Sequence, residues 1–152
     1  MSRTKKSPTT TVVAFDPGER TGWAVARFDP DDLDSFEILD QGVWTVVECM
    51  DGLGQLLERA DVVVYETWRL YETHALAMIG NDMQPSQVVG MIRYEARQQD
   101  KTTRSQGANI KSMALSTTPP WVVKHMALSS EKHDQDAILH AWHYAFAKAH
   151  GH

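Results

Sequence analysis

The stretch Thr11-Val-Val-Ala-Phe-Asp16-Pro17-Gly18-Glu19-Arg20-Thr21-Gly22-Trp23-Ala-Val-Ala26 decides the fold of this chain. Its Val, Phe and Thr residues favour strands, and Pro17-Gly18 favours a tight turn between them. We therefore expect two adjacent antiparallel strands, with Asp16 at the end of the first. A carboxylate in that position is costly unless a positive charge lies nearby. Asp16 thus predicts a neighbouring lysine, arginine or metal ion.

Two further acidic positions match this pattern. Asp61-Val-Val-Val-Tyr-Glu66 is another apolar run that ends in a carboxylate, and its consecutive valines are typical of a central parallel strand. His133-Asp134-Gln135-Asp136-Ala137 opens the last helical pattern. Hard divalent cations take oxygen ligands. Three separated acidic positions therefore indicate a site for such cations.

These residues carry a resemblance to a known family. Three short motifs resemble those of the RuvC family and occur in the same order. They are Asp16-Pro17-Gly18 with Thr21-Gly22 and Ala24, then Glu66, then His133 with Asp136-Ala137. RuvC proteins are Holliday-junction resolvases with a ribonuclease-H-like fold. The small size and divergent middle of the chain resemble the phage-encoded branch more than the bacterial one.

The resemblance implies a metal-dependent nuclease. Two Mg²⁺ ions about 3.5–4 Å apart can serve both ends of an in-line phosphodiester displacement, and Mn²⁺ is expected to substitute. Asp16 would bridge both ions, Glu66 would bind one and Asp136 the other. The implied function is an endonuclease that cleaves branched DNA, above all Holliday junctions, in recombination or repair.

The fourth position of the site has two candidates. In most bacterial members of the family the C-terminal motif is Asp-x-x-Asp. Here His133 takes the place of its first aspartate, three residues before Asp136 and on the same helical face. His133 could orient water or phosphate, or accept a proton. Asp134 is the competing metal ligand, on another side of the helix. His140 follows Asp136 by one turn and could line the same site.

Three residues are candidate contacts at the DNA crossover. Trp68, Arg69 and Tyr71 follow Glu66, and in the family an aromatic residue just after this Glu lies at the crossover and helps to open it. Stacking on a base is worth roughly 1–3 kcal/mol. The resemblance therefore implies that this segment touches the branch point of the DNA.

Charge is unevenly distributed along the 152 residues, whose net charge is −5. Residues 29–51 contain many acids and no Lys or Arg, whereas basic residues outnumber acids over residues 93–132. The distribution matters more than the sum for nucleic-acid binding. We expect the acidic segment to face away from DNA and the basic one to contact backbone phosphates, which would make binding sensitive to salt. Arg104 and Lys111 are the candidate contacts, and Gln106 is a weaker one.

The pattern of apolar residues predicts an α/β fold with a mixed sheet of five strands flanked by helices. After a polar loop at 29–35 we expect the third strand at 36–46. The expected order is three strands, a helix, a strand, helices, a strand and further helices. The predicted strands span 11–16, 22–28, 36–46, 61–67 and 102–105, and the helices span 49–60, a stretch ending near 79, 85–99, 108–115, 121–128 and a last helix, capped near Ser129 or Ser130, that ends near 149.

Length and composition fit one domain. We expect a disordered basic tail at 1–10, a single nuclease domain at 11–149 and a frayed tail at 150–152. No apolar stretch reaches the roughly 20 residues that span a membrane, and a single cysteine, Cys49, fits a reducing cytoplasm. If the chain is phage-encoded, that is the cytoplasm of the bacterial host. A twofold dimer suits a four-way junction, and the helix at 85–99 is the expected interface.

Three other interpretations remain open on the sequence. A non-catalytic DNA-binding or scaffold protein could use the same fold. An actin-like or sugar-kinase-like phosphotransferase also opens with an Asp-Gly-Thr-Gly turn, but a second Gly-rich phosphate loop is absent from the sequence. His140 and His143 could form part of a zinc site, although no cysteine pair accompanies them.

Overall fold

Three consecutive strands form an antiparallel meander in the computed structural model, which describes residues 8–67, 83–128 and 131–151. They are β1 (Thr10–Asp16), β2 (Arg20–Asp29) and β3 (Asp32–Thr45). In the pairing of β1 with β2, Asp16 lies opposite Gly22. The Thr21 hydroxyl donates to the Gly18 carbonyl and accepts from the Gly18 amide, both at 3.2 Å. The predicted turn at Pro17-Gly18 therefore joins the first two strands.

Two parallel strands complete the sheet. β4 (Val62–Glu66) pairs with β1, and β5 (Thr102–Gln106) pairs with β4. The strand order is β3-β2-β1-β4-β5, so the acidic β3 and the strand that carries Arg104, β5, lie at opposite edges. This arrangement confirms the predicted mixed sheet of five strands.

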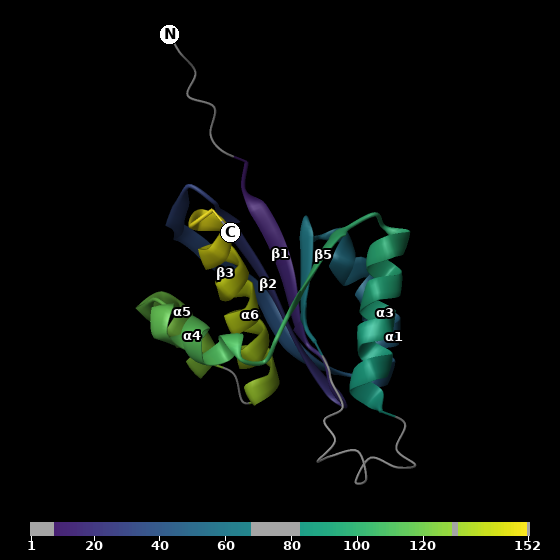
Figure 1. The fold of residues 1–152 in the computed structure, drawn as a ribbon. Helices are drawn as coiled ribbons and strands as arrows, with labels where there is room; N and C mark the ends of the chain where they lie inside the picture. Colours follow the sequence, from purple (N-terminus) through teal and green to yellow (C-terminus); the bar gives the residue numbers. More distant parts are fainter. Residues whose placement is uncertain (1–7, 68–82, 129–130, 152) are drawn as a thin grey trace.

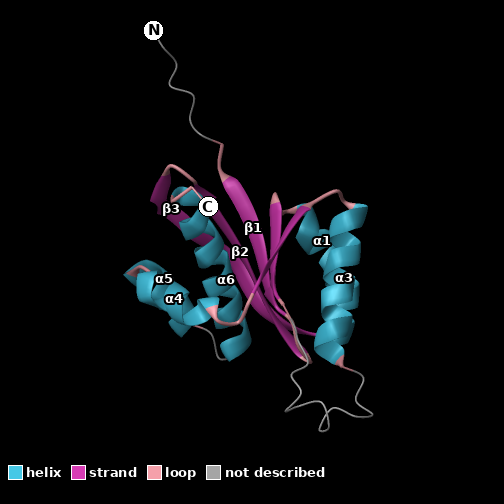
Figure 2. Ribbon diagram, viewed as in Figure 1, coloured by secondary structure: helices cyan, strands magenta, loops and turns pink. Residues whose placement is uncertain are grey.

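Helices cover both faces of the sheet (Figures 1 and 2). The α1 and α3 helices lie on one face, and α4, α5 and α6 lie on the other. A capping box between Thr45 and Glu48 starts α1, and Pro85 lies in the first turn of α3, as predicted. The helices are α1 (Val46–Glu58), α3 (Gln84–Gln98), α4 (Ile110–Thr117), α5 (Pro120–Ala127) and α6 (Lys132–Ala149).

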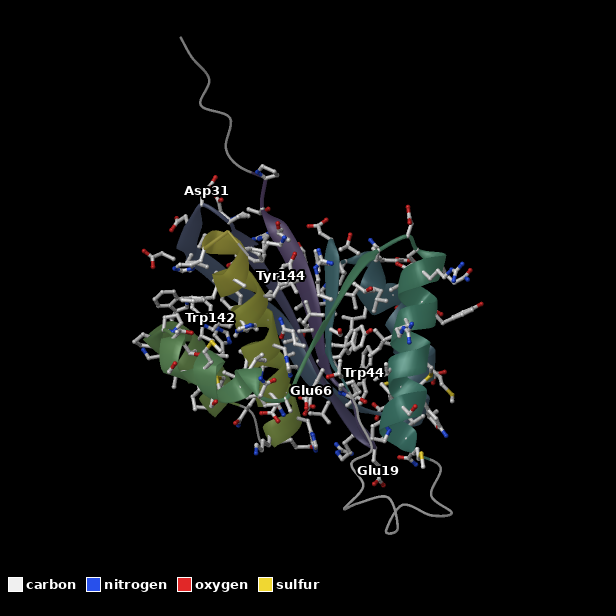
Figure 3. All side chains as sticks on the ribbon, viewed as in Figure 1. Glu19, Asp31, Trp44, Glu66, Trp142 and Tyr144 are labelled. Carbon is white, nitrogen blue, oxygen red and sulfur yellow. The ribbon has the colours of Figure 1, made fainter. Side chains whose placement is uncertain are left out.

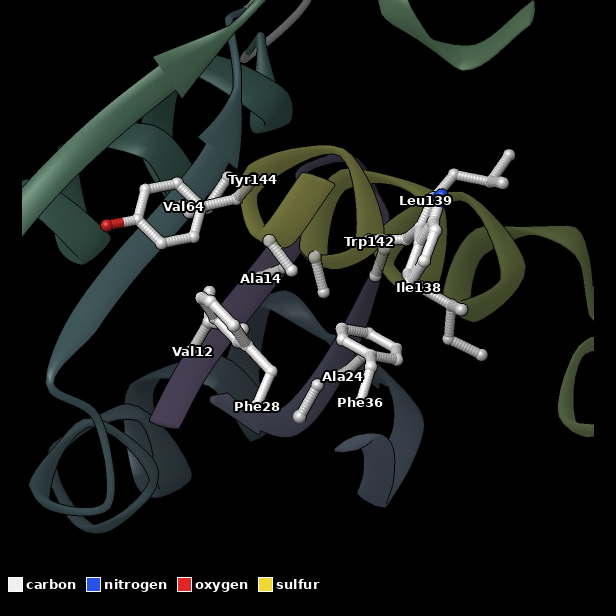
Figure 4. Packing of buried hydrophobic residues seen from close by; sticks show 14 of the residues in the cluster. Val12, Ala14, Ala24, Phe28, Phe36, Val64, Ile138, Leu139, Trp142 and Tyr144 are labelled. Atoms are coloured by element: carbon white, nitrogen blue, oxygen red, sulfur yellow. The ribbon is translucent and has the colours of Figure 1, made fainter. Parts of the chain in front are cut away.

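Alternation along β1 divides the core in two. Val13 and Phe15 pack with α1 and α3, whereas Val12 and Ala14 pack with α6. The α6 side also contains Trp142, whose ring meets Phe36 edge to face at 5.1 Å (Figure 4). Side chains of a strand point to opposite faces in turn. The carboxylate of Asp16 therefore belongs to the α6 face.

Some predicted boundaries were wrong. The third strand starts at Asp32 rather than at 36, so the predicted polar loop at 29–35 shrinks to a two-residue turn at Pro30 and Asp31. The acids are compatible with a strand here because β3 is an edge strand and their side chains remain in solvent. The α6 helix begins with Glu131 at its N-cap position, without a side-chain cap; Ser129 and Ser130 lie outside the described residues. Among the described helices, none is long and apolar enough to cross a membrane.

Candidate active site

Asp16 and Glu66 are brought together by strand pairing. Both residues end their strands, and β1 and β4 are parallel neighbours. On β4, Val62 and Val64 pack against α6, so Glu66 points to the same face as Asp16. Their side chains are 13% and 15% exposed, respectively. Figure 3 shows Glu66 at the end of the sheet, beside the start of α6.

The first turn of α6 brings the third carboxylate to this point. A Cβ on Gly22 would lie 1.9 Å from the His133 carbonyl oxygen and 2.5 Å from the Asp134 amide nitrogen. Only glycine therefore allows α6 to start this close to β2, opposite Asp16. The Asp136 side chain, 11% exposed, faces the sheet as a result.

Lys111 of α4 lies between the carboxylates. Its Nζ is 2.9 Å from Glu66 Oε2 and 3.2 Å from Asp136 Oδ2. Burial opposes the charge of Lys111, but hydrogen bonding to Glu66 and the nearby charge of Asp16 raise its pKa above the ordinary value. Lys111 is thus the positive charge that the sequence led us to expect near Asp16. The sequence indicated a phosphate contact at this residue and missed its place among the acids.

The surroundings shift the pKa values of Asp16 and Glu66 in opposite directions. Burial, and next the charge of Glu66, raise the pKa of Asp16 from 3.8 to about 8. Burial also opposes ionisation of Glu66, but hydrogen bonds from His140 and Lys111 outweigh it and lower the pKa of Glu66 to about 2. Near neutral pH the site therefore holds a proton on Asp16 that a metal ion would displace.

The two candidates for the fourth position lie in different surroundings. His133 Nδ1 is 3.5 Å from Asp16 Oδ2, with the His133 side chain 44% exposed. Asp134 instead accepts a hydrogen bond of 3.0 Å from Gln41 on β3. His133 therefore lies with the carboxylates, while Asp134 links the start of α6 to β3.

His140 and Gln106 form the inner wall of the site. His140 Nε2 is 2.9 Å from Glu66 Oε2, and His140 Nδ1 is 2.7 Å from Gln106 Oε1. Sequence reasoning placed His140 near the site from its spacing to Asp136. It missed the role of Gln106, which the pairing of Gln106 with Glu66 could have indicated once β5 was aligned with β4.

The candidate DNA contacts are only partly described. Arg104 is exposed on β5, two residues before Gln106 and therefore on the same face of the strand. It lies near Tyr144 of α6, where its charge opposes the rise that burial causes in the pKa of the tyrosine. Trp68, Arg69 and Tyr71 lie outside the described residues.

The carboxylates of the site are suitable ligands for a hard cation, although the described residues contain no group already arranged to bind one. There, no group of three His, Cys, Asp or Glu side chains is arranged to hold a metal ion as it stands. Two carboxylates, those of Glu66 and Asp136, nevertheless contact one ammonium group, that of Lys111, and the charge of Asp16 acts on the same group. Carboxylate oxygens are the ligands that Mg²⁺ prefers. The Lys111 ammonium thus stands in for the positive charge that such an ion would supply.

Comparison with known proteins gives structural matches only. No model of a protein family matches the chain, and no curated protein matches its sequence. Thermus thermophilus RuvC, solved in complex with a Holliday junction substrate, has a TM-score of 0.70 at 17% identity, covering 93% of this chain and 96% of RuvC. The yeast mitochondrial Holliday junction resolvase has a TM-score of 0.57 at 14% identity, covering 96% of this chain and 80% of the resolvase. The fowlpox virus resolvase, solved with Holliday junction DNA, has a TM-score of 0.54 at 11% identity, and the match covers 93% of this chain and 99% of the resolvase.

These matches define the class of fold. The chain has a ribonuclease-H-like α/β fold, as the sequence predicted. Within that class it has the fold of RuvC and of other Holliday junction resolvases. The resemblance first seen in three short motifs is therefore confirmed at the level of the fold.

Proposed function

We propose that this chain is a divalent-metal-dependent endonuclease that cleaves branched DNA and most readily resolves Holliday junctions. The observation that carries the proposal is the convergence of Asp16, Glu66 and Asp136 on the Lys111 ammonium group, at the end of strands β1 and β4. Two neighbours of the same fold were solved with Holliday junction DNA, which supports branched DNA as the substrate.

Asp16, Glu66 and Asp136 would hold Mg²⁺, most simply as two ions with Mn²⁺ able to replace them; Asp134 is the alternative fourth ligand. When bound, such ions activate the attacking water and stabilise the leaving oxygen of the phosphodiester. Metal binding would displace the proton on Asp16, so that all three side chains would act as carboxylates.

The remaining polar side chains bind or move protons in this proposal. His133, beside Asp16 and 44% exposed, can take up a proton from the attacking water. Arg104 would contact backbone phosphates of the DNA. Lys111 would do so with its ammonium group released from Glu66 and Asp136. The proposed crossover contacts are Trp68, Arg69 and Tyr71, which stay sequence predictions.

The proposed assembly is a homodimer of a nuclease domain spanning 11–149. A junction presents two equivalent strands, and a twofold dimer places one site at each. The sequence places the interface at the helix 85–99, and the exposed side chains of Tyr94 on α3 and of Val47 and Met50 on α1 are its candidate contacts. A role in recombination or repair in a bacterial cytoplasm, and a phage origin, stay predictions from the sequence.

The experiment is cleavage of labelled four-way, three-way and linear DNA with Mg²⁺, by the wild type and by Asp16→Asn. We expect paired nicks in the four-way junction, lost in Asp16→Asn by at least about 100-fold, while junction binding in EDTA persists. Equal cutting of forks would broaden the substrate to branched DNA in general. No cutting with Mg²⁺ or Mn²⁺ by the folded protein would leave a DNA-binding module.

A further inference from the structure

His140 is a buried polar side chain that the proposed chemistry does not use directly. It lies in α6, one helical turn after Asp136, and its side chain is 0% exposed. Both of its ring nitrogens have partners: Nε2 lies 2.9 Å from Glu66 Oε2, and Nδ1 lies 2.7 Å from Gln106 Oε1. The Glu66 carboxylate only accepts, so Nε2–H is the donor to it, and a neutral imidazole then pairs at Nδ1 with the NH2 group of the Gln106 amide. An imidazole held at both nitrogens has one orientation, because any rotation would leave a buried polar atom without a partner.

The sheet fixes both partners of His140. Glu66 and Gln106 lie directly opposite each other in the pairing of β4 with β5. The chain beyond them is also tied down, because the Thr67 amide donates to the Gln106 carbonyl at 2.8 Å and the Thr67 hydroxyl donates to it at 3.3 Å. His140 therefore connects α6 to two side chains whose backbones are held by strand pairing.

We propose that His140 is a positioning residue that orients the Glu66 carboxylate for metal binding, with Gln106 holding the imidazole. The inference rests on the proposed function. The last torsion of a glutamate side chain is broad, so a carboxylate at a strand end has no fixed rotation of its own. The bond from His140 Nε2–H to Oε2 fixes that rotation.

A purely structural role is the competing explanation, because His140 also fills space between α6 and β4. The two roles differ in what they change. Loss of packing lowers stability, whereas loss of orientation lowers metal affinity at equal stability. Hydrogen-bond partners of metal ligands typically change affinity by about 10–100-fold when removed.

Two substitutions separate these roles. In His140→Gln the amide nitrogen replaces Nε2, so the donor to Glu66 is kept. In His140→Asn the amide replaces Nδ1, so the contact with Gln106 is kept and the donor to Glu66 is lost. Both remove the aromatic ring. The probe is Mn²⁺ alone, titrated calorimetrically into the full-length protein without DNA, with melting curves recorded in parallel.

We expect His140→Asn to raise the Mn²⁺ dissociation constant by about 10–100-fold, and His140→Gln to lie closer to the wild type. Gln106→Leu, which leaves α6 unchanged, should weaken Mn²⁺ binding in the same direction. Ile138→Val, a buried change on the same helix, should lower the Tm without changing Mn²⁺ affinity.

Equal Mn²⁺ affinity in His140→Asn and the wild type would overturn the positioning role, while junction cleavage by the wild type would leave the proposed function intact. If His140→Asn fails to fold, wild-type affinity in Gln106→Leu overturns the role. A folded wild type that neither binds Mn²⁺ nor cleaves junctions would overturn the proposed function and the role of His140 with it.

Discussion

At the scale of single residues, the site concentrates negative charge in a place that is poor in water. Asp16, Glu66 and Asp136 all have side chains at most 15% exposed. The Lys111 ammonium contacts two of them and lies near the third. Such an arrangement costs stability, as is common where function needs charge.

The first prediction concerns Asp16 and pH. The folded state binds the Asp16 proton more tightly than the unfolded chain, since the pKa rises from 3.8 to about 8. The stability linked to this proton is complete below pH 4 and is lost as the pH rises towards 8. Asp16→Asn carries no such charge. Its metal-free Tm at pH 8 should exceed that of the wild type, by roughly 2–4 °C for each kcal/mol gained.

Melting curves from pH 5 to pH 8 without metal check this prediction. The difference in Tm between Asp16→Asn and the wild type should shrink as the pH falls. Glu66 does not confuse the result, because its lowered pKa of about 2 contributes stability that is constant above pH 5. A difference in Tm that is independent of pH would contradict the raised pKa of Asp16.

The second prediction concerns Lys111. Lys111→Met leaves the carboxylates without their cation, and we expect the metal-free protein to lose about 1–3 kcal/mol of stability. Because Mg²⁺ supplies the missing charge, it should stabilise the variant more than the wild type. Denaturant melts with and without Mg²⁺ measure both effects. Lys124→Met, an exposed lysine on α5, is the matched control; equal losses in the two variants would rule out a special role.

At the scale of elements, the position of α6 decides whether the carboxylates meet. The helix carries Asp136 and His140, packs along β1 and β2, and begins against the backbone of Gly22. The alternation of side chains along β1 and β4 directs Asp16 and Glu66 to the face that α6 covers. A small change in where α6 starts would therefore separate Asp136 from the strand-end carboxylates.

The third prediction tests this close approach. In Gly22→Ala the new methyl group would lie 1.9 Å from the His133 carbonyl oxygen, so α6 must move. We expect a loss of about 1–3 kcal/mol and a loss of Mn²⁺ affinity.

Gly90→Ala is the control, because a Cβ there meets no atom within 4 Å. This exposed position in α3 should gain roughly 0.5–1 kcal/mol from helix propensity. Denaturant melts and Mn²⁺ titrations of both variants make the comparison. Unchanged stability and affinity in Gly22→Ala would show that α6 does not need this approach.

At the scale of the whole molecule, exposed apolar side chains lie on both faces of the sheet, among them Tyr94 on α3 and Met113 on α4. The acidic β3 and the strand that carries Arg104, β5, occupy opposite edges of the sheet. Net charge alone, at −5, would have argued against DNA. The α1 and α3 helices lie across the sheet from α4, α5 and α6 (Figure 2), and α3 is the helix proposed to contact a second copy of the chain.

The fourth prediction concerns that second copy. Tyr94 is 62% exposed on α3, and Tyr94→Arg places a charge in the proposed dimer interface. We expect the mass measured by light scattering to fall from that of two chains to that of one, because a buried unpaired charge opposes association. Met113→Arg, at a similarly exposed position on α4 across the sheet, should leave the mass unchanged. A wild type that is monomeric at all concentrations would remove the proposed dimer.

The sequence by itself determined the class of fold and the strand-end carboxylates. Runs of valine and phenylalanine with a Pro-Gly turn are local signals, and strand alternation follows from backbone geometry alone. Apolar runs that end in a carboxylate singled out Asp16 and Glu66, and the resemblance to the RuvC motifs added Asp136 to the candidate site. The extent of β3 could not, because acids on an edge strand look the same in a sequence as acids in a loop.

Only the tertiary structure decided which side chains surround those acids. The sequence indicated that Lys111 and Gln106 contact phosphates. In the structure Lys111 lies beside Asp136, and Gln106 lies beside His140. Their places depend on how α4, β5 and α6 pack together, and these contacts join residues more than 20 positions apart in the chain. No local pattern encodes such a distance, whereas the burial that results shifts the pKa of Asp16 and gives the site its chemistry.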